Sequence, residues 1–439
     1  MILLHGLGGA KDLPVPAPLA IAAGGIALLA SFTVLAVAWR KPRYADGPSA
    51  GRRPPDALER ILDGATLAVV LRLLGLAFFG YVTWALIAGP NVNTNPALGV
   101  FYVLVWVGVI PASLLFGRVA RAVSPARTID LALGSLIRGR VDRGLWRYPE
   151  RLGYWPAAVG LLAFVWQELV NPDQVDLSTV QTWLAAYLVI MLLGAAAFGD
   201  VWFERADPFE VYSNLLAGLS VWGRDDDGRL VVRSPLANLA RLPVRPGLVA
   251  VVAVLFGSTA FDSYKDSLTW VNLVDRITSH PELFNTFALV VFCAVVGVTF
   301  TIAAIATPAR ADIPRRLLPD LLAHSVVPIV VGYMVAHYLS FFVEQGQSTI
   351  VQLSDPMETG ANILGTAGYS ANLWLSAHPT FLATTKVIAV VTGHVVGIIA
   401  AHDRALVVLP ERRKVTGQIA MLVLMICYTT AGLWLLFGT

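Results

Sequence analysis

The sequence predicts an all-α fold, a polytopic transmembrane helix bundle of about ten spans. Hydrophobic residues make up 56% of the 439 residues and charged residues only 14%, whereas soluble domains carry roughly 25% charged residues. Apolar stretches recur along the chain at lengths that reach or approach the roughly 20 residues needed to cross a bilayer. No connection between them is long enough for a soluble domain, so residues 1–439 are predicted to form a single integral membrane domain.

The predicted spans are distributed along the whole chain. The first is expected to be a retained helix, because it follows His5, Lys11 and Asp12 and not a basic segment, and no cleavage pattern comes after it. The fourth and sixth are short. In order, the ten spans cover residues 17–39, 65–88, 98–117, 155–170, 178–202, 247–261, 283–307, 318–341, 381–401 and 416–438.

The basic residues predict how these spans are oriented. Of the 32 lysines and arginines, 27 lie in every second connection, at residues 40–61, 118–154, 203–246, 308–316 and 402–415. Connections that stay in the cytoplasm carry such an excess. Both termini are therefore predicted to be extracytoplasmic, in the inner or plasma membrane of the cell. The net charge of +3 reflects this loop bias, so membrane lipid is an expected partner and nucleic acid is not.

Two connections are expected to have structure of their own. Within residues 203–246, Asp207 is an N-cap residue and Pro208 takes the first helical position. Apolar residues follow at helical spacing, which predicts an amphipathic helix on the cytoplasmic face of the membrane. Residues 225–228 predict a solvated turn. On the outer side, the long connection 342–380 is expected to fold over the outer mouth as a lid.

The histidines are the first functional candidates, because ionisable side chains are costly inside a bilayer. His337 and Glu344 lie on neighbouring turns of one predicted helix near the outer face, and His5 and His378 lie in outer connections. Histidine and carboxylate ligands with an open position let a metal ion activate water. We therefore predict that His337 and Glu344 are catalytic and that His5, His337, His378 and Glu344 hold a divalent metal. Ordinary interfacial histidines are the alternative, since no His-Glu-x-x-His spacing occurs.

A second candidate pair lies deeper in the predicted bundle. His324 and His394 fall at similar depth and meet if the eighth and ninth spans pack together, where they would bind a cofactor or quinone. Haem is less favoured than a divalent metal, and the sequence identifies neither. Pro328 removes the hydrogen bond to the His324 carbonyl and predicts a kink. A structural contact between helices explains this pair equally well, and His402 is interpreted as a cytoplasmic helix end.

The sequence lacks the motifs that are typical of several function classes. No Walker loop, dinucleotide fingerprint or Gly-x-Ser-x-Gly nucleophile elbow is present. Glu168 and Asp200 lie near predicted span ends and are expected to be solvated. The sequence therefore predicts no acidic group at mid-membrane depth, which argues against a proton-coupled carrier.

Several short segments together resemble a known family. The chain is similar to polytopic membrane proteins of actinobacteria and relatives that are labelled fenitrothion-hydrolase-like. The resemblance implies an inner-membrane organophosphate hydrolase that works with a second membrane subunit, and it supplies no catalytic motif that can be carried over residue by residue. The segments are His5-Gly6 with Asp12-Leu13-Pro14, Asp207-Pro208-Phe209-Glu210-Val211-Tyr212, Gly257-Ser258-Thr259-Ala260-Phe261-Asp262, Ala336-His337-Tyr338 with Gln345-Gly346-Gln347, and Gly393-His394 with Ala401-His402-Asp403-Arg404.

Two functions therefore remain open at this stage. The first is a metal-dependent hydrolase whose His337 and Glu344 site faces outward. The alternative is a permease, or an accessory membrane subunit that binds a cofactor, quinone or metal through His324 and His394.

Overall fold

The protein is an all-α, multi-pass membrane protein. The computed structural model describes residues 9–44, 51–137 and 144–438. Eight helical segments in this part of the chain are long and apolar enough to cross a membrane, and a bent pair adds a ninth. The eight are Ala17–Ala38, Asp56–Ala88, Leu177–Phe198, Leu248–Lys265, Pro281–Ala306, Arg315–Gln352, Pro379–Val408 and Thr416–Phe437.

Two of the ten predicted spans differ from simple crossing helices. The predicted third span is the bent pair, Pro96–Val105 and Val109–Phe116, which meet at 47°. The first of these segments ends in a π-helical stretch, Val100–Val105, and such stretches open the regular hydrogen-bond ladder. The predicted fourth span is the helix Trp155–Leu169. Its 15 residues rise only about 22 Å, so alone it is shorter than a ~30 Å hydrocarbon layer.

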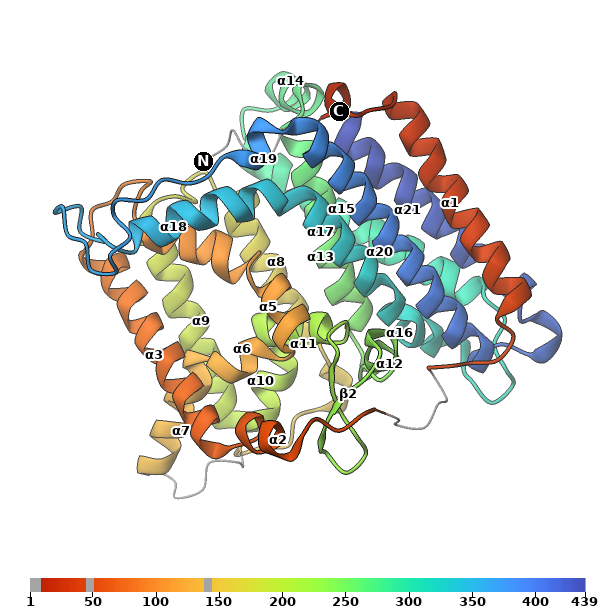
Figure 1. Cartoon of the computed structure of the whole chain (residues 1–439), viewed down its shortest axis with the longest axis horizontal. Helices are drawn as coiled ribbons and strands as arrows, with labels where there is room; N and C mark the ends of the chain where they lie inside the picture. The colour runs from red at the N-terminus through yellow and green to blue at the C-terminus, as the bar shows by residue number, and fades with distance from the viewer. Residues whose placement is uncertain (1–8, 45–50, 138–143, 439) are drawn as a thin grey trace.

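The helices form two groups that lie side by side (Figure 1). The first group comprises α2 (Asp56–Leu62), α3 (Ala65–Ala88), α4 (Pro96–Gly99), α5 (Val109–Phe116), α6 (Val119–Val123), α7 (Pro125–Ile137), α8 (Trp155–Leu169), α9 (Leu177–Phe198), α10 (Asp200–Ala206) and α11 (Pro208–Ala217). The second comprises α1 (Ala17–Ala38), α13 (Leu248–Lys265), α14 (Leu268–Ile277), α15 (Pro281–Ala306), α16 (Leu318–Leu322), α17 (Val327–Ser340), α20 (Pro379–Val408) and α21 (Ile419–Phe437).

The two groups meet where α8 packs on α13 and α11 packs on α17. We call this contact the seam. Three short helices lie outside the groups, α12 (Pro235–Leu239), α18 (Gly346–Gln352) and α19 (Trp374–Ala377). The ends that carry α14, α18 and α19 lie on one side of the molecule (Figure 1). This side is called the outer side, following the predicted orientation.

Helix α11 begins as the sequence predicts but does not lie on a surface. The Asp207 carboxylate caps it by accepting the backbone N–H groups of Phe209 and Glu210 at 3.0 and 3.3 Å. Most of its residues are buried, and Pro208 packs so tightly on α8 that a Cβ on Gly160 would come within 3.0 Å of it. The expectation of a helix on the membrane surface is therefore wrong. Polar side chains of α11 such as Glu210 find hydrogen-bond partners inside the protein, so the helix can be buried.

The largest of these internal polar contacts is an ion cluster at the inner end of the first group. Arg127 of α7 forms a two-pronged contact with Glu210 of α11, at 2.5 and 2.8 Å. Asp200 and Arg121 complete the cluster. Glu210 is only 1% exposed, and a charge at such a position is tolerated only when it is paired. The cluster therefore fixes α7, α10 and α11 relative to one another.

Small residues bring α17 and α20 together in the second group. A Cβ on Gly393 would lie 2.5 Å from the Pro328 carbonyl oxygen, and a Cβ on Gly332 would lie 3.0 Å from Gly393. Close backbone approach of this kind is typical of helix contacts in membranes. Near Pro328, where the sequence predicts a kink, a 3-10 turn at Ala323–Val326 interrupts the α-helical hydrogen bonds between α16 and α17.

The two long connections have short elements of their own. Strands β1 (Trp222–Arg224) and β2 (Leu230–Val232) form an antiparallel hairpin whose turn contains residues 225–228, as predicted. On the outer side, α18 packs on α4, with Thr349 against Gly99. The segment 342–380 therefore covers the outer end of the first helix group.

The contribution of the ion cluster to the stability of the protein can be tested. Replacing Glu210 by Gln leaves the buried Arg127 charge under-compensated and should lower stability by about 3 kcal/mol. The double variant Arg127→Met with Glu210→Met should be closer to the parent, because no charge is then buried unpaired. Thermal unfolding of the detergent-purified protein measures both. A Glu210→Gln protein that melts with the parent would show that the pair does not hold the fold.

Candidate functional site

A cavity of about 270 Å³ opens at the outer end of the seam. One wall comes from the first helix group and the chain that joins α8 to α9, and includes Glu168 and Gln174. The other comes from the outer end of α13, with Asp262, Lys265 and Asp266. The cavity therefore has three carboxyl groups and one ammonium group in its lining.

Asp262 is the centre of the hydrogen bonds behind this cavity. The Tyr338 hydroxyl donates to Asp262 Oδ2 at 2.8 Å, and His337 Nε2 lies 2.8 Å from the same oxygen. Lys265 Nζ lies 3.6 Å from Oδ1. Asp262 and His337 are 6% and 5% exposed. The carboxylate thus connects α13 to α17 across the protein interior.

The second nitrogen of His337 has a defined role. Ser263 Oγ donates its one proton to the Thr259 carbonyl at 2.9 Å, and it accepts from the Tyr333 hydroxyl at 2.9 Å. His337 Nδ1 lies 3.1 Å from this Oγ. With the Ser263 proton on the Thr259 carbonyl, Nδ1 acts as the donor in this contact. In that arrangement, His337 has its proton on Nδ1.

This assignment constrains the contact between His337 and Asp262. With Nδ1 protonated, the Nε2 and Oδ2 atoms need one proton between them to form a hydrogen bond. The pair is then either an imidazolium with a carboxylate or a neutral imidazole with a carboxylic acid. In both forms it stores one proton beside the cavity, and intramembrane groups of this kind mark proton or solute pathways.

Glu168 differs from its sequence interpretation. Its Oε2 is buried and has no hydrogen-bond partner within the described residues, and the side chain lines the cavity. Glu168 is therefore half-buried at the cavity, with one oxygen shielded, where the sequence suggested a solvated side chain. Asp200 is 49% exposed at its side chain but is paired with Arg127 and Arg121.

The predicted outer metal ligands are placed apart from His337 as far as the structure describes them. Glu344 accepts hydrogen bonds from the backbone N–H and the hydroxyl of Ser376, at 2.9 and 2.6 Å. His378 bonds the Trp374 carbonyl at 2.8 Å and stacks on its ring. His5 lies outside the described residues. Within those residues, no group of three His, Cys, Asp or Glu side chains is arranged to hold a metal ion.

A physical reason for this separation is visible in the helix. The π-helical turn Phe341–Gln345 lies between His337 and Glu344. Such a turn has more residues than an α-helical turn, so residues seven apart no longer share a face. Glu344 instead ties α19, through Ser376, to the π turn between α17 and α18.

The deeper histidines are held by separate local contacts. His324 Nδ1 lies 3.1 Å from the Leu321 carbonyl, and His394 Nδ1 lies 2.9 Å from the Val390 carbonyl. His324 lies near Ala400, six residues along α20 from His394 and thus about 9 Å further along its axis. Among the described contacts, none joins the two rings. His394 Nε2 is buried without a hydrogen-bond partner there.

His402 is a buried structural contact inside α20 and not the end of that helix. It is 1% exposed, and its ring nitrogens lie 3.0 Å from Gln418 Oε1 and 2.8 Å from the Trp39 carbonyl. Helix α20 continues past it to Val408. The ring joins the inner ends of α1, α20 and α21.

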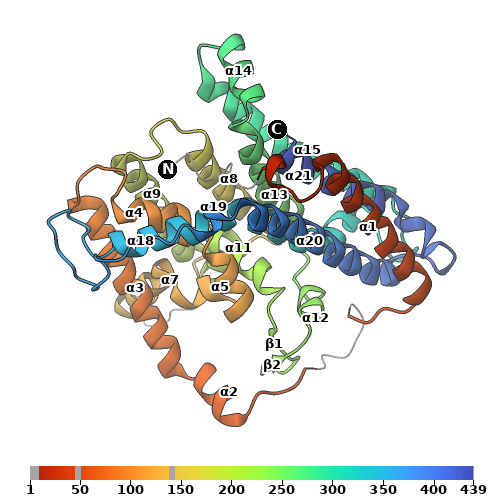
Figure 2. The same ribbon diagram turned by 45° about the horizontal axis from the view of Figure 1, so that its top comes forward.

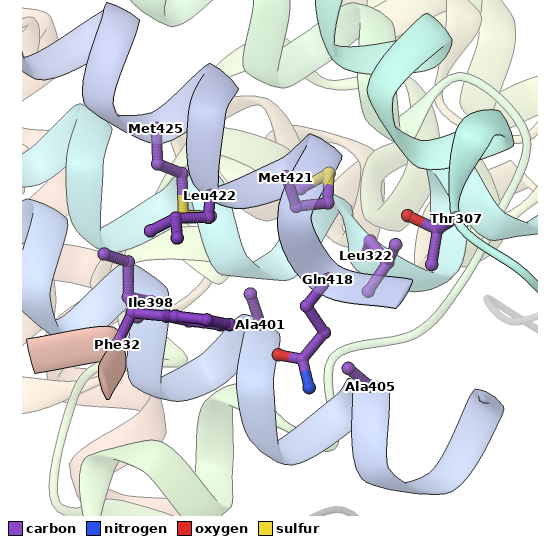
Figure 3. A pocket seen from close by; sticks show the side chains of 10 residues that line it. All are labelled: Phe32, Thr307, Leu322, Ile398, Ala401, Ala405, Gln418, Met421, Leu422 and Met425. Carbon is purple, nitrogen blue, oxygen red and sulfur yellow. The ribbon is translucent and has the colours of Figure 1, made fainter. Parts of the chain in front are cut away.

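A nearby apolar cavity is too small to be a site. It holds about 20 Å³ and is lined mainly by apolar side chains, with Thr307 and Gln418 at one side (Figure 3). A single water needs roughly 10–15 Å³ by this measure. The space therefore fits little more than one water molecule.

Comparisons with protein-family models, with curated proteins and with solved structures find no match for this chain. The resemblance inferred from the sequence stays a prediction, and function has to be argued from the outer cavity itself.

The position of the cavity can be tested by labelling. In a variant with Cys293 and Cys427 replaced by alanine, Asn93→Cys should react with a membrane-impermeant thiol reagent added outside intact cells, because Asn93 lines the cavity. Arg229→Cys, in the turn of the hairpin, should react only after the membrane is opened. Labelling with the opposite sidedness would contradict the predicted orientation.

Proposed function

We propose that this protein is a permease of the inner or plasma membrane that takes a small polar solute from the outer side and exchanges a proton with it. The observation that carries the proposal is the outer cavity at the seam, backed by the hydrogen-bonded pair Asp262 and His337, which can hold a shared proton. A solute that enters the cavity reaches Asp262 directly. Its binding can therefore change the free energy of holding the proton.

The architecture of the seam supports this proposal. Solute sites of many transporters lie between two helix groups, next to helices that are interrupted inside the membrane. Here the interrupted pair Pro96–Val105 and Val109–Phe116 and the buried helix α11 lie at the seam. Tyr212 of α11 contacts Met334 of α17 at 3.3 Å and packs on Trp106. These large side chains close the seam below the cavity, as a state open to the outside requires.

The lining also indicates the solute class. Glu168, Asp262 and Asp266 outnumber Lys265 among the charged groups, so the cavity favours cations. An amine or a small organic cation can donate hydrogen bonds to the unpaired Glu168 oxygen. We therefore propose a small cationic or amine solute.

A hydrolase is the second candidate, favoured by one observation. Ser263, His337 and Asp262 are joined in the order nucleophile, base and acid, and the family resemblance implies phosphotriester hydrolysis with a partner subunit. The proton of Ser263 is donated to Thr259, however, and Ser263 does not line the cavity. The permease accounts for more of the site.

Transport can be measured on the purified protein in proteoliposomes that contain a pH-sensitive dye. Adding methylammonium, choline or ethanolamine outside should change the internal pH in the parent, and this response should be lost in Asp262→Asn and Glu168→Gln. Asp275→Asn, at an exposed position on α14, is the matched control and should respond like the parent. The His337→Gln variant should retain solute binding but lose the coupled proton movement.

The same preparation separates the two candidates. Phosphotriester hydrolysis that disappears in Ser263→Ala, with no pH response to any of the three amines, would contradict the permease and favour the hydrolase.

A further inference from the structure

A second cavity of about 320 Å³ lies on the inner side of the molecule, between the inner ends of α5 and α11 and the hairpin with α12. Figure 2 shows the hairpin and α12 at the end opposite α14. Four arginines line it, Arg118, Arg224, Arg233 and Arg241, and no acidic residue among those that the structure describes does so. Its chemistry is thus opposite to that of the outer cavity.

The positive charge of this cavity is only partly neutralised. Arg224 is paired with Asp63 at 2.5 Å, and Arg241 with Asp226 at 3.1 Å. In the described part of the chain, neither Arg118 nor Arg233 forms an ion pair. Two guanidinium groups therefore face the cavity in excess of the acids around it.

Hydrogen bonds fix the Arg233 guanidinium and leave one of its nitrogens without a partner among the described residues. Its Nε donates to Asn238 Oδ1 at 2.5 Å, and its Nη2 donates to the Arg224 carbonyl. Asn238 is itself fixed by donating to the Ser220 carbonyl at 2.8 Å. Nη1 of Arg233 is buried and has no hydrogen-bond partner among the described residues. Burial, and then the neighbouring Arg241, lower the pKa of Arg233.

The surrounding residues leave space for this arrangement. A Cβ at Gly223 would lie 2.5 Å from Arg233 Nε, so glycine is required for the guanidinium to take this position. Asn214 also lines the cavity, and its buried Oδ1 has no hydrogen-bond partner in the described residues. The cavity thus contains a buried spare donor and a buried spare acceptor, and each costs free energy until a ligand satisfies it.

We propose that this cavity binds the phosphate group of an anionic ligand, with Arg118 and Arg233 as its charged contacts and Asn214 as acceptor for a ligand hydroxyl. Guanidinium groups match the oxygens of a phosphate and bind it through paired hydrogen bonds. The adjacent Leu115 and Phe116 are 62% and 73% exposed, so the cavity opens beside apolar surface at the membrane boundary. A lipid headgroup and a soluble phosphate share this chemistry.

Binding can be measured on the full-length protein in a neutral detergent. Inorganic phosphate and pyrophosphate are titrated by calorimetry, and phosphatidylglycerol is compared with phosphatidylcholine by native mass spectrometry. We expect one of the anionic probes to bind, at least tenfold more weakly in Arg118→Gln and Arg233→Gln. Arg310→Gln, an exposed arginine paired with Asp312, is the control and should bind like the parent.

Each outcome decides the proposal. Preference for phosphatidylglycerol identifies a lipid headgroup, and preference for pyrophosphate identifies a soluble phosphate. Arg118 makes no ion pair that folding needs in the described structure, so Arg118→Gln keeps the test valid if Arg233→Gln unfolds. Binding that is equal in Arg118→Gln and the parent, or no binding of any anionic probe, overturns the proposal.

Discussion

The Asp262 carboxylate imposes the constraint on which the outer half of the structure depends. A carboxylate buried among membrane helices must find its partners inside the protein. Here the partners come from α17, through His337 and Tyr338, while Lys265 lies on the helix of Asp262 itself. This requirement sets the rotation of α13 and α17 about their axes. It also leaves Asp262 and Glu168 lining one cavity at the seam.

In the inner half of the structure, buried charges are also paired inside the protein, by different residues. Arg127 and Glu210 neutralise each other where α7 meets α11, and Asp207 caps α11 inside the protein. These contacts let a short helix sit at the seam with its first backbone N–H groups capped. The two cavities have opposite charge, the outer one rich in carboxylates and the inner one rich in arginine. The buried side chains of Trp106 and Tyr212 pack on each other where α11 meets α17.

Sequence reasoning predicts those features that depend on local composition. The all-α class, most of the spans and the Asp207 cap follow from hydropathy and single-residue chemistry. The site does not, because convergence depends on how each helix is rotated. The π turn after Ser340 moves Glu344 away from His337, and Asp262 lies on another helix, 75 residues before His337. The pairing of Ser263 with His337 has no spacing signal, since 74 residues separate them.

The proton shared by Asp262 and His337 is the central claim, and nitrogen NMR of the ring tests it most directly. Protein labelled with ¹⁵N at histidine, with the His337 signals assigned by comparison with His337→Gln, reports the protonation of each ring nitrogen. With the Ser263 proton on the Thr259 carbonyl, we expect a protonated Nδ1, with Nε2 sensitive to Asp262→Asn and Nδ1 unaffected by it. An unprotonated Nδ1, or an Nε2 signal that Asp262→Asn leaves unchanged, would contradict the account.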